Sequence, residues 1–197
     1  MPVAGGTEGR RVHYDAPDAA PLLGAALQEA LVGCGLPGRP LVFLCIGTDR
    51  STGDALGPLV GERLQRMVGD CASVLGTLDV PVHASNLQEV LDRLSATEPG
   101  AVIVAVDACL GRTESVGTIA VGRGGLAPGA GVNKALPTVG AAFVTGIVNV
   151  GGFMEYFVLQ NTRLQLVVRM AEVISDALAL TSAAVCGRAA GAIGASA

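Results

Sequence analysis

Short, continuous apolar runs alternate along this chain with longer segments in which apolar residues recur every three or four positions. Continuous runs of this length are typical of strands buried on both faces, and the three-to-four repeat is typical of amphipathic helices. Strands are predicted at residues 41–46, 80–84, 101–106, 117–121 and 142–148, and helices at 22–32, 54–68, 86–95 and 164–178. The pattern predicts an α/β fold: a three-layer α/β/α sandwich with a mainly parallel sheet, in which 117–121 is an antiparallel edge strand.

The chain is expected to form one domain. Its 197 residues are enough for a single substantial core and too few for two comfortable ones. Residues 1–21 are rich in Gly, Pro and charge and are predicted to be a flexible arm, while residues 183–197 are rich in small residues and are predicted to be a frayed tail. The α/β domain is therefore placed at residues 22–182.

The amino-acid composition limits which residue types can form the core and which classes of partner the protein can bind. Half of the residues are hydrophobic but only 3% are aromatic, so the core must consist mainly of Val, Leu, Ile and Ala. The formal net charge is −4 and no basic tract is present. Because nucleic-acid binding requires clustered Lys and Arg to neutralise phosphates, a nucleic-acid partner is not expected.

Cysteine usage and the apolar runs bear on cellular location. The five cysteines are scattered, without a CxxC pair or zinc-type spacing, and we expect reduced, mostly buried thiols in a cytoplasmic protein. The first 17 residues lack the apolar core of a secretion signal, and no run approaches the roughly 20 apolar residues of a membrane span. Neither export nor a membrane partner is therefore expected.

Acidic residues follow two of the predicted strands. Residues 41–46 end at Gly47, and Asp49 and Asp54 come next, while Asp107 closes the strand 101–106. Ligands of open α/β sheets bind at the carboxyl ends of strands, where two acids in one cleft could divide general acid and base roles. Structural explanations remain open: Asp54 could cap a helix, Asp107 could brace a loop and Asp49 could fix a turn.

Three further residues are candidates for substrate binding. His83 ends the predicted strand 80–84 and could be a ligand, a base or an orienting group, or simply a structural histidine. Lys134 is a loop cation that could bind a substrate carboxylate or be solvated. Glu155 lies among bulky apolar residues and could be a partly buried partner or the start of the last helix.

Other chemistries find little support. The segment GTDRSTGDALG lacks both GxGxxG and the GK[ST] ending of a phosphate-binding loop, and its acid would compete with an anion for the same backbone donors. Neither Ser51 nor Ser115 lies in GxSxG, and Cys45 and Cys109 have no histidine nearby in sequence. Nucleotide binding, serine hydrolysis and cysteine nucleophiles are not expected.

Four segments between residues 41 and 180 together resemble the YyaC family of spore-former proteins (DUF1256). They are CIGTDRSTGDALGPLVG, VAVDACLG, APGAGVNKALPTVG and NVGGFMEYFVLQNTRL. That family is similar in turn to the germination protease of spores and, more distantly, to the hydrogenase maturation endopeptidases. The resemblance implies a peptidase-type fold with Asp54 and Asp107 at the positions of the germination protease's two essential acids.

The resemblance also bears on metal binding. In the maturation endopeptidases the matching acids bind a metal with help from a downstream histidine, and no histidine follows Asp107 here. No cofactor is therefore expected, and any divalent metal would use Asp54 and Asp107.

These observations lead to a functional hypothesis with one rival. We expect a sporulation-associated endopeptidase of the forespore or spore interior, which uses an aspartate pair to activate water against a peptide bond of a spore protein. The rival is a catalytically inactive sporulation scaffold with the same fold, because the chain is much shorter than a germination protease and shows no clear propeptide. Self-association through the apolar residues 153–159 is a further possibility.

Overall fold

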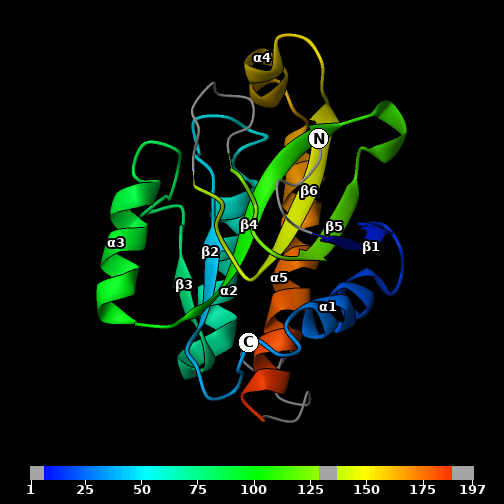
Figure 1. The fold of residues 1–197 in the computed structure, drawn as a ribbon. Helices are drawn as coiled ribbons and strands as arrows, with labels where there is room; N and C mark the ends of the chain where they lie inside the picture. Colours follow the sequence, from blue (N-terminus) through cyan, green and yellow to red (C-terminus); the bar gives the residue numbers. More distant parts are fainter. Residues whose placement is uncertain (1–6, 129–136, 188–197) are drawn as a thin grey trace.

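A six-stranded mixed sheet forms the centre of the computed structural model, which describes residues 7–128 and 137–187 (Figure 1). Its strand order is β1-β5-β6-β4-β2-β3. The strands are β1 (Thr7–His13), β2 (Leu41–Cys45), β3 (Ser73–Leu75), β4 (Val102–Gly111), β5 (Thr118–Arg123) and β6 (Ala142–Val150). The strands β3, β2, β4 and β6 pair in parallel, and β5 and β1 add antiparallel pairings at one side.

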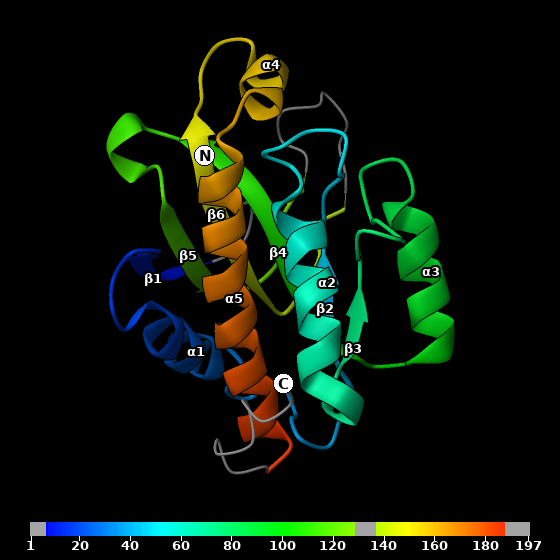
Figure 2. The same cartoon turned by 180° about the vertical axis from the view of Figure 1, so that it is seen from behind.

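Helices cover both faces of the sheet. They are α1 (Ala19–Ala30), α2 (Leu56–Val68), α3 (Leu87–Thr97), α4 (Glu155–Gln160) and α5 (Leu164–Val185). Seen from behind, α1, α2 and α5 lie across one face, whereas α3 packs beside β2 and β3 on the other and α4 stands beyond the ends of the strands (Figure 2). The three-layer α/β/α architecture and the mainly parallel sheet predicted from the sequence are confirmed. None of the described helices has the length and apolar character needed to cross a membrane.

The strand β2 shows why continuous apolar runs predicted buried strands. Phe43 and Cys45 belong to the larger core beneath α1, α2 and α5, whereas Leu44 belongs to a smaller core beneath α3. All five residues of β2 are buried. A strand between two helical layers must be apolar at every position, because alternate side chains point to opposite faces.

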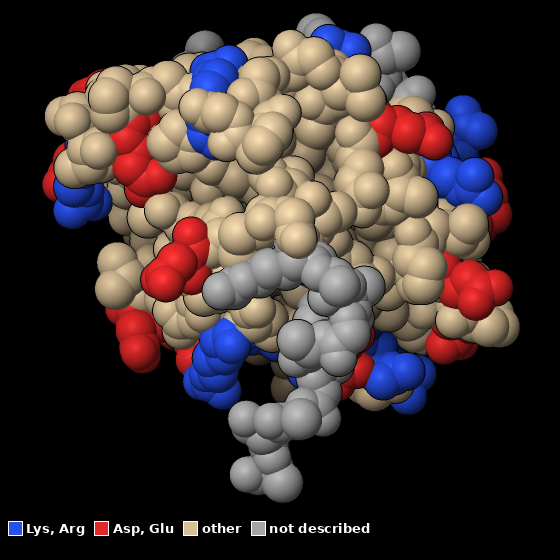
Figure 3. Space-filling view, turned by 90° about the horizontal axis from the view of Figure 1, so that it is seen from below, with Lys and Arg blue, Asp and Glu red and all other residues tan. Residues whose placement is uncertain are grey.

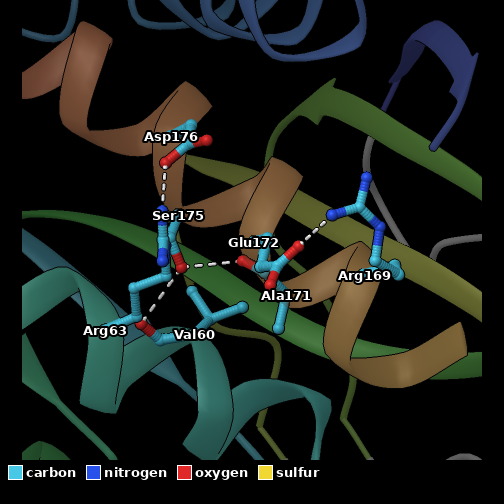
Figure 4. A network of polar contacts seen from close by, with 7 residues as sticks. All are labelled: Val60, Arg63, Arg169, Ala171, Glu172, Ser175 and Asp176. Atoms are coloured by element: carbon cyan, nitrogen blue, oxygen red, sulfur yellow. Dashed lines mark hydrogen bonds and ion pairs between the residues drawn. The ribbon is translucent and has the colours of Figure 1, made fainter. Parts of the chain in front are cut away.

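The helices α2 and α5 are joined through apolar packing with a polar bridge at its edge (Figure 4). The buried Ser175 hydroxyl lies 2.7 Å from the Ala171 carbonyl oxygen of its own helix and 3.4 Å from that of Val60 in α2. Arg63 of α2 forms an ion pair with Asp176 of α5 at 3.0 Å. Both partners of this pair are exposed, so it contributes only about 0–1 kcal/mol and the apolar contacts dominate.

Charged side chains are mixed on the face opposite α4. Viewed from below, Arg groups are interspersed with Asp and Glu groups around the rim (Figure 3). On that face the described residues show no large basic patch.

The N-terminal segment is more ordered than predicted. The flexible arm predicted for residues 1–21 is wrong for the part that the structure describes: β1 pairs antiparallel with β5, and α1 begins at Ala19. In β1 Val12 is buried and its neighbours are polar. Backbone pairing stabilises such an edge strand without an apolar pattern that the sequence would reveal.

Three strand predictions also need correction. Residues 80–84 form no strand, since Val82 makes only an isolated bridge to Ile46, and β3 pairs with β2 instead. The strand β5 is not at the edge, because β1 covers it. The strand β4 continues to Gly111, so Asp107 lies within it rather than at its end.

At the C-terminus α5 continues beyond residue 182 to Val185, and residues 188–197 lie outside the described part of the chain.

Two glycines allow α2 to approach the sheet at backbone distance. A Cβ atom at Gly57 would lie 2.0 Å from the Ile46 carbonyl oxygen, and one at Gly61 would lie 2.2 Å from that of Gly76. Both contacts are with backbone atoms, which cannot rotate away. Any larger residue must therefore push the helix off the sheet.

Replacing Gly57 with alanine tests this constraint. Overpacking a rigid contact usually costs about 1–3 kcal/mol, and for a backbone clash we expect Gly57→Ala to lie at or above the upper end of that range. Thermal or denaturant unfolding measures the loss. The exposed Gly38 is a suitable control, because its Cβ would meet nothing closer than 3.4 Å. Gly38→Ala should change stability by less than about 0.5 kcal/mol, and equal losses in both variants would contradict the argument.

A disulfide links Cys71, just after α2, to Cys186 at the end of α5, with the two Cα atoms 5.6 Å apart. The expectation of five reduced thiols is therefore wrong for this pair, while Cys34, Cys45 and Cys109 are free. The two cysteines are 115 residues apart in sequence, so spacing alone could not pair them.

Reduction of this disulfide should destabilise the protein. A crosslink that closes a long loop restricts the unfolded chain and typically contributes about 2–4 kcal/mol. We expect dithiothreitol to lower the free energy of unfolding by that amount in the parent protein and to have no effect on a Cys71→Ala variant. Cys34→Ala is the control, and it should remain as sensitive to the reductant as the parent. A parent protein insensitive to reduction would contradict the crosslink.

Candidate active site

The loop that carries Asp54 folds back over the end of β2. The Thr48 N–H donates to the Asp54 carbonyl oxygen at 3.1 Å, and a Cβ atom at Gly47 would lie only 1.9 Å from the same oxygen. Gly47 also has a φ of 151°, which favours glycine. The residue at the N-cap of α2 is Ala55, so Asp54 is not the helix cap that spacing left open. Its position is fixed by the strand end and not by the helix.

The environment of Asp54 favours its protonated form. The side chain is partly buried, and burial raises the pKa of the Asp54 carboxyl above its ordinary value. The Ser51 side chain acts in the opposite direction, since its interaction with the ionised carboxylate lowers the pKa. Ser51 is itself buried in the same loop, and its hydroxyl makes no hydrogen bond of ordinary geometry among the described residues. The net effect is an acid that holds its proton more tightly than a solvated aspartate.

The side chain of Asp107 is positioned by the pleat of β4. Val104 and Val106 contribute to the larger core and Ala105 to the smaller one, so alternation places Asp107 on the side of Ala105. Its Oδ1 accepts a hydrogen bond from the Ala108 N–H at 2.8 Å. Asp107 thus projects from a strand paired on both sides, which restricts its movement more than a loop would.

Asp107 belongs to a row of residues that are directly paired across the sheet. Asp107 is opposite Thr145 of β6, Thr145 is opposite Ala120 of β5, and Ala120 is opposite Arg11 of β1. Thr145 also interacts with the Cys109 side chain, which follows Asp107 on the same side of β4. The row therefore places an acid, a hydroxyl and a thiol close together on one face.

The backbone of Ile46 and Gly47 brings three candidate residues to one edge. The Ile46 N–H donates to the Val106 carbonyl oxygen at 2.7 Å, and the Gly47 N–H donates to that of Val82 at 2.7 Å. Asp107 follows Val106, and His83 follows Val82. Because Asp54 lies over Gly47, the backbones of all three candidates lie around the carboxyl end of β2, where the pairing of β4 with β2 stops. Substrates of parallel sheets bind at such strand ends.

His83 has a well-defined backbone at the start of α3. Its N–H donates to Asn86 Oδ1 at 2.8 Å, and its carbonyl oxygen accepts from the N–H groups of Asn86 and Leu87. The residue is partly buried. These bonds hold the backbone of His83 beside the end of β2.

The remaining candidates differ in exposure and in bonding. Asp49 is exposed in the β2–α2 loop. The Oε1 atom of Glu155 accepts from the Gly152 N–H at 3.2 Å, so this acid closes the turn that leads into α4. Lys134 lies outside the described residues. Asp54, Asp107 and His83 are thus the three predicted site residues that the fold places together.

The described residues do not supply the set of two acids and a histidine that the maturation endopeptidases use for a metal. Across residues 7–128 and 137–187, no three His, Cys, Asp or Glu side chains are arranged so that they could hold a metal ion. The free cysteines at this edge are also poor ligands, since burial raises the pKa of the Cys45 thiol to about 12. Burial, and then the charge of Asp107, raise the pKa of the Cys109 thiol to about 11. Both are neutral thiols near pH 7.

Sequence reasoning missed two polar residues of this site. The sequence motif excludes Ser51 as a nucleophile but does not reveal its second possible role. A serine three residues before an acid in a turn can interact with that acid, here Asp54. Thr145 interrupts the apolar run of β6 and is paired with Asp107 of β4. A polar residue in an otherwise buried strand indicates that a polar partner lies nearby, because buried polar groups are hydrogen-bonded.

The fold is similar to that of a peptidase of known structure. The chain resembles the crystal structure of a [NiFe] hydrogenase maturation protease, HycI from Thermococcus kodakarensis KOD1, with a TM-score of 0.51 and 19% sequence identity. The match covers 79% of this chain and 97% of HycI. At this level of identity the likeness establishes a peptidase-type α/β fold.

Sequence comparison then identifies the family. Residues 11–177 match the family described as "Protein of unknown function (DUF1256)", and the chain belongs to that family. It is 56% identical over 144 residues to "Uncharacterized protein YyaC" of Bacillus subtilis (strain 168). The aligned region covers 73% of this chain and 70% of the Bacillus protein. The resemblance to the YyaC family noted from motifs is confirmed.

The raised pKa of Asp54 predicts a pH-dependent gain in stability for Asp54→Asn. Because the folded state binds this proton more tightly than the unfolded state, the wild-type protein loses stability as pH rises through the folded-state pKa. The variant should therefore unfold at a higher temperature than the parent at pH 7. The difference should shrink as pH falls below that pKa and the parent takes up the proton.

Thermal unfolding between pH 4 and pH 8 measures this difference. Asp49→Asn removes one charge from an exposed position of the same loop and is the matched control. A gain in the Asp54 variant that does not change with pH, or an equal gain in the control, would rule out burial of the Asp54 carboxyl as the cause.

Proposed function

We propose that this protein is an aspartate-dependent endopeptidase that hydrolyses a peptide bond in a protein of the developing or germinating spore. The observation that carries the proposal is that backbone bonds bring the loop of Asp54, whose pKa is raised by burial, beside Asp107, where the pairing of β4 with β2 stops. The peptidase-type fold and membership of the DUF1256 family support it. The expected location is the forespore or spore interior.

The two acids are proposed to divide the chemistry according to their environments. The Asp107 carboxylate accepts a proton from a water molecule as the water oxygen attacks the scissile carbonyl carbon. Protonated Asp54 hydrogen-bonds to the developing oxyanion and then donates its proton to the leaving nitrogen as the C–N bond breaks. The products are a carboxylic acid and an amine, and proton exchange with solvent restores both acids.

His83 is proposed to orient the substrate beside these acids. Its backbone is held by Asn86, and it lies on the strand edge from which Asp54 and Asp107 also project. Lys134 is proposed to contact a substrate carboxylate, in keeping with its place in the loop that resembles the germination protease. Glu155 is left out of this assignment, because its carboxylate is bonded to its own turn.

A non-catalytic binding protein is the second candidate. The observation in its favour is the incomplete metal-ligand set, which distinguishes the described residues from the three-ligand site implied by the maturation endopeptidases. Such a protein would bind a spore polypeptide at the same edge without cleaving it.

A cleavage assay with purified small acid-soluble spore proteins separates the two candidates. Under the peptidase proposal, Asp54→Asn and Asp107→Asn each lower the rate by at least about 100-fold, because general acid or base catalysis contributes about 10²–10⁴-fold. Product peptides are identified by mass spectrometry, and circular dichroism verifies folding. Asp18→Asn, at an exposed acid before α1, is the control and should retain the parent rate.

The outcome that contradicts the peptidase proposal is equally specific. If both acid variants are folded and cut as fast as the parent, the acids are not catalytic. If the parent binds a spore protein but yields no product, the binding-protein candidate replaces it.

A further inference from the structure

The segment around α4 exposes an unusual share of the chain's large apolar side chains. Phe153, Met154, Tyr156, Phe157 and Leu164, here termed the apolar cap, are exposed by 83, 58, 69, 56 and 59%, respectively. The whole chain contains only four Phe and two Tyr residues and no Trp. Half of these six aromatic residues are therefore concentrated within five positions, and all three are mostly in solvent. A protein with so few aromatic residues gains nothing in stability by exposing them.

Polar bonds hold the apolar cap against the loop that carries Asp54. The Gly53 N–H donates to the Leu159 carbonyl oxygen at 2.9 Å, and the Thr52 hydroxyl donates to that of Gln160 at 3.3 Å. In both ribbon views α4 stands beside the β2–α2 loop, beyond the ends of the strands (Figures 1 and 2). The cap is thus a fixed neighbour of the candidate acids.

The base of the cap is also fixed to the sheet. Asn149 of β6 donates from its side-chain amide to the Thr162 hydroxyl at 3.2 Å and to the Val158 carbonyl oxygen at 3.3 Å. A Cβ atom at Gly53 would lie 2.7 Å from the Leu159 side chain, so the loop and α4 are in close contact. These contacts are made by residues on the side of α4 that faces the sheet and the loop. The side chains of the apolar cap make no such contacts and are exposed to solvent.

The area of the cap indicates the size of its occupant. Aromatic side chains present about 150–250 Å² each, so the five side chains together expose an area on the order of 500 Å². A stable dimer usually buries about 800 Å² on each partner. Apolar patches of about 300–600 Å² on monomers are often functional. The area suits a few side chains of an extended polypeptide better than a second folded subunit.

We propose that the apolar cap binds a segment of the polypeptide substrate that carries large aliphatic or aromatic side chains. Binding there anchors the substrate beside Asp54, with an adjoining segment laid across the ends of β2 and β4. This inference rests on the proposed function, because it names the recognition element of the same site. It predicts a preference for substrates in which large apolar residues flank the scissile bond.

Peptide binding tests the cap without requiring cleavage. The probes are two fluorescein-labelled 12-residue peptides, one with three Leu or Phe residues in a Gly-Ser background and one with Ser at those positions. Fluorescence anisotropy is measured with the Asp54→Asn/Asp107→Asn protein, which cannot cut under the proposal. We expect the apolar peptide to bind at least about tenfold more tightly than the serine peptide, since aromatic anchors dominate such contacts.

Variants of the cap identify where the peptide binds. Adding Phe153→Ser and Phe157→Ser to the Asp54→Asn/Asp107→Asn protein should weaken its binding of the apolar peptide at least about tenfold. Val32→Ser is the matched control, because Val32 is 67% exposed and follows α1. Equal affinity for the two peptides, or an equal loss in the cap variant and the control, would overturn the proposal.

Other occupants of the cap would be recognised in the same samples. Sedimentation velocity that shows a parent dimer, and a monomer for the Phe153→Ser/Phe157→Ser protein, would assign the cap to a second copy. Cap-dependent flotation with phosphatidylglycerol vesicles would assign it to a lipid surface. Either result overturns the assignment to a polypeptide substrate.

The outcome for the cap is distinguishable from the outcome for catalysis. If the apolar peptide binds through the cap but the parent cleaves no spore protein, the peptidase proposal fails and the cap remains a polypeptide-binding surface. If the parent cleaves and the cap variants keep its KM and binding, the cap proposal fails alone. If both proposals are correct, the cap variants raise KM for apolar substrates at least about tenfold.

Discussion

The contact between the backbone of α2 and the end of β2 determines the geometry of the candidate site. Gly57 lies against the Ile46 carbonyl oxygen, and Gly47 lies beneath that of Asp54, at distances that no Cβ atom could share. The loop between strand and helix is thereby folded onto the sheet instead of projecting into solvent. Asp54 owes its position to this fold, and Asp107 owes its position to the neighbouring strand.

This geometry also accounts for the different environments of the two acids. A carboxyl in a loop pressed against the sheet loses hydration, which raises the pKa of Asp54. Asp107 instead stands in a ladder of paired strands, with a backbone N–H donated to its Oδ1. The acid and base roles proposed above thus fall on aspartates with different surroundings.

Sequence patterns predicted the strands and helices whose burial requires apolar residues at regular positions along the chain. The strands β2 and β4 are continuous apolar runs because they lie between two layers, and α2 and α5 repeat apolar residues because one side of each faces the core. The patterns did not predict β1 or β3, since β1 is an edge strand with mixed polarity and β3 has only three residues. The Cys71–Cys186 pairing depends on tertiary proximity across 115 residues, which no local signal encodes.

For the site, candidate residues could be chosen from the sequence, but their placement in the fold could not. Asp54, Asp107 and His83 could be chosen because each stands near the end of an apolar run. That Asp107 lies within β4, and that Glu155 bonds to its own turn, depend on strand length and turn geometry that apolar patterning does not specify. The contribution of Ser51 depends on its burial beside Asp54, which becomes visible only once the loop is folded.

The segment that carries α4 is a single excursion between β6 and α5, and its apolar side chains contribute little to either core. Its sequence can therefore change without loss of the fold, provided that the few bonds to Gly53, Thr52 and Asn149 remain. The glycine contacts beneath Asp54 allow no such freedom. The part of the molecule that would select a partner thus stands outside the packed cores, while the part that would act on it is held by the packing of the whole domain.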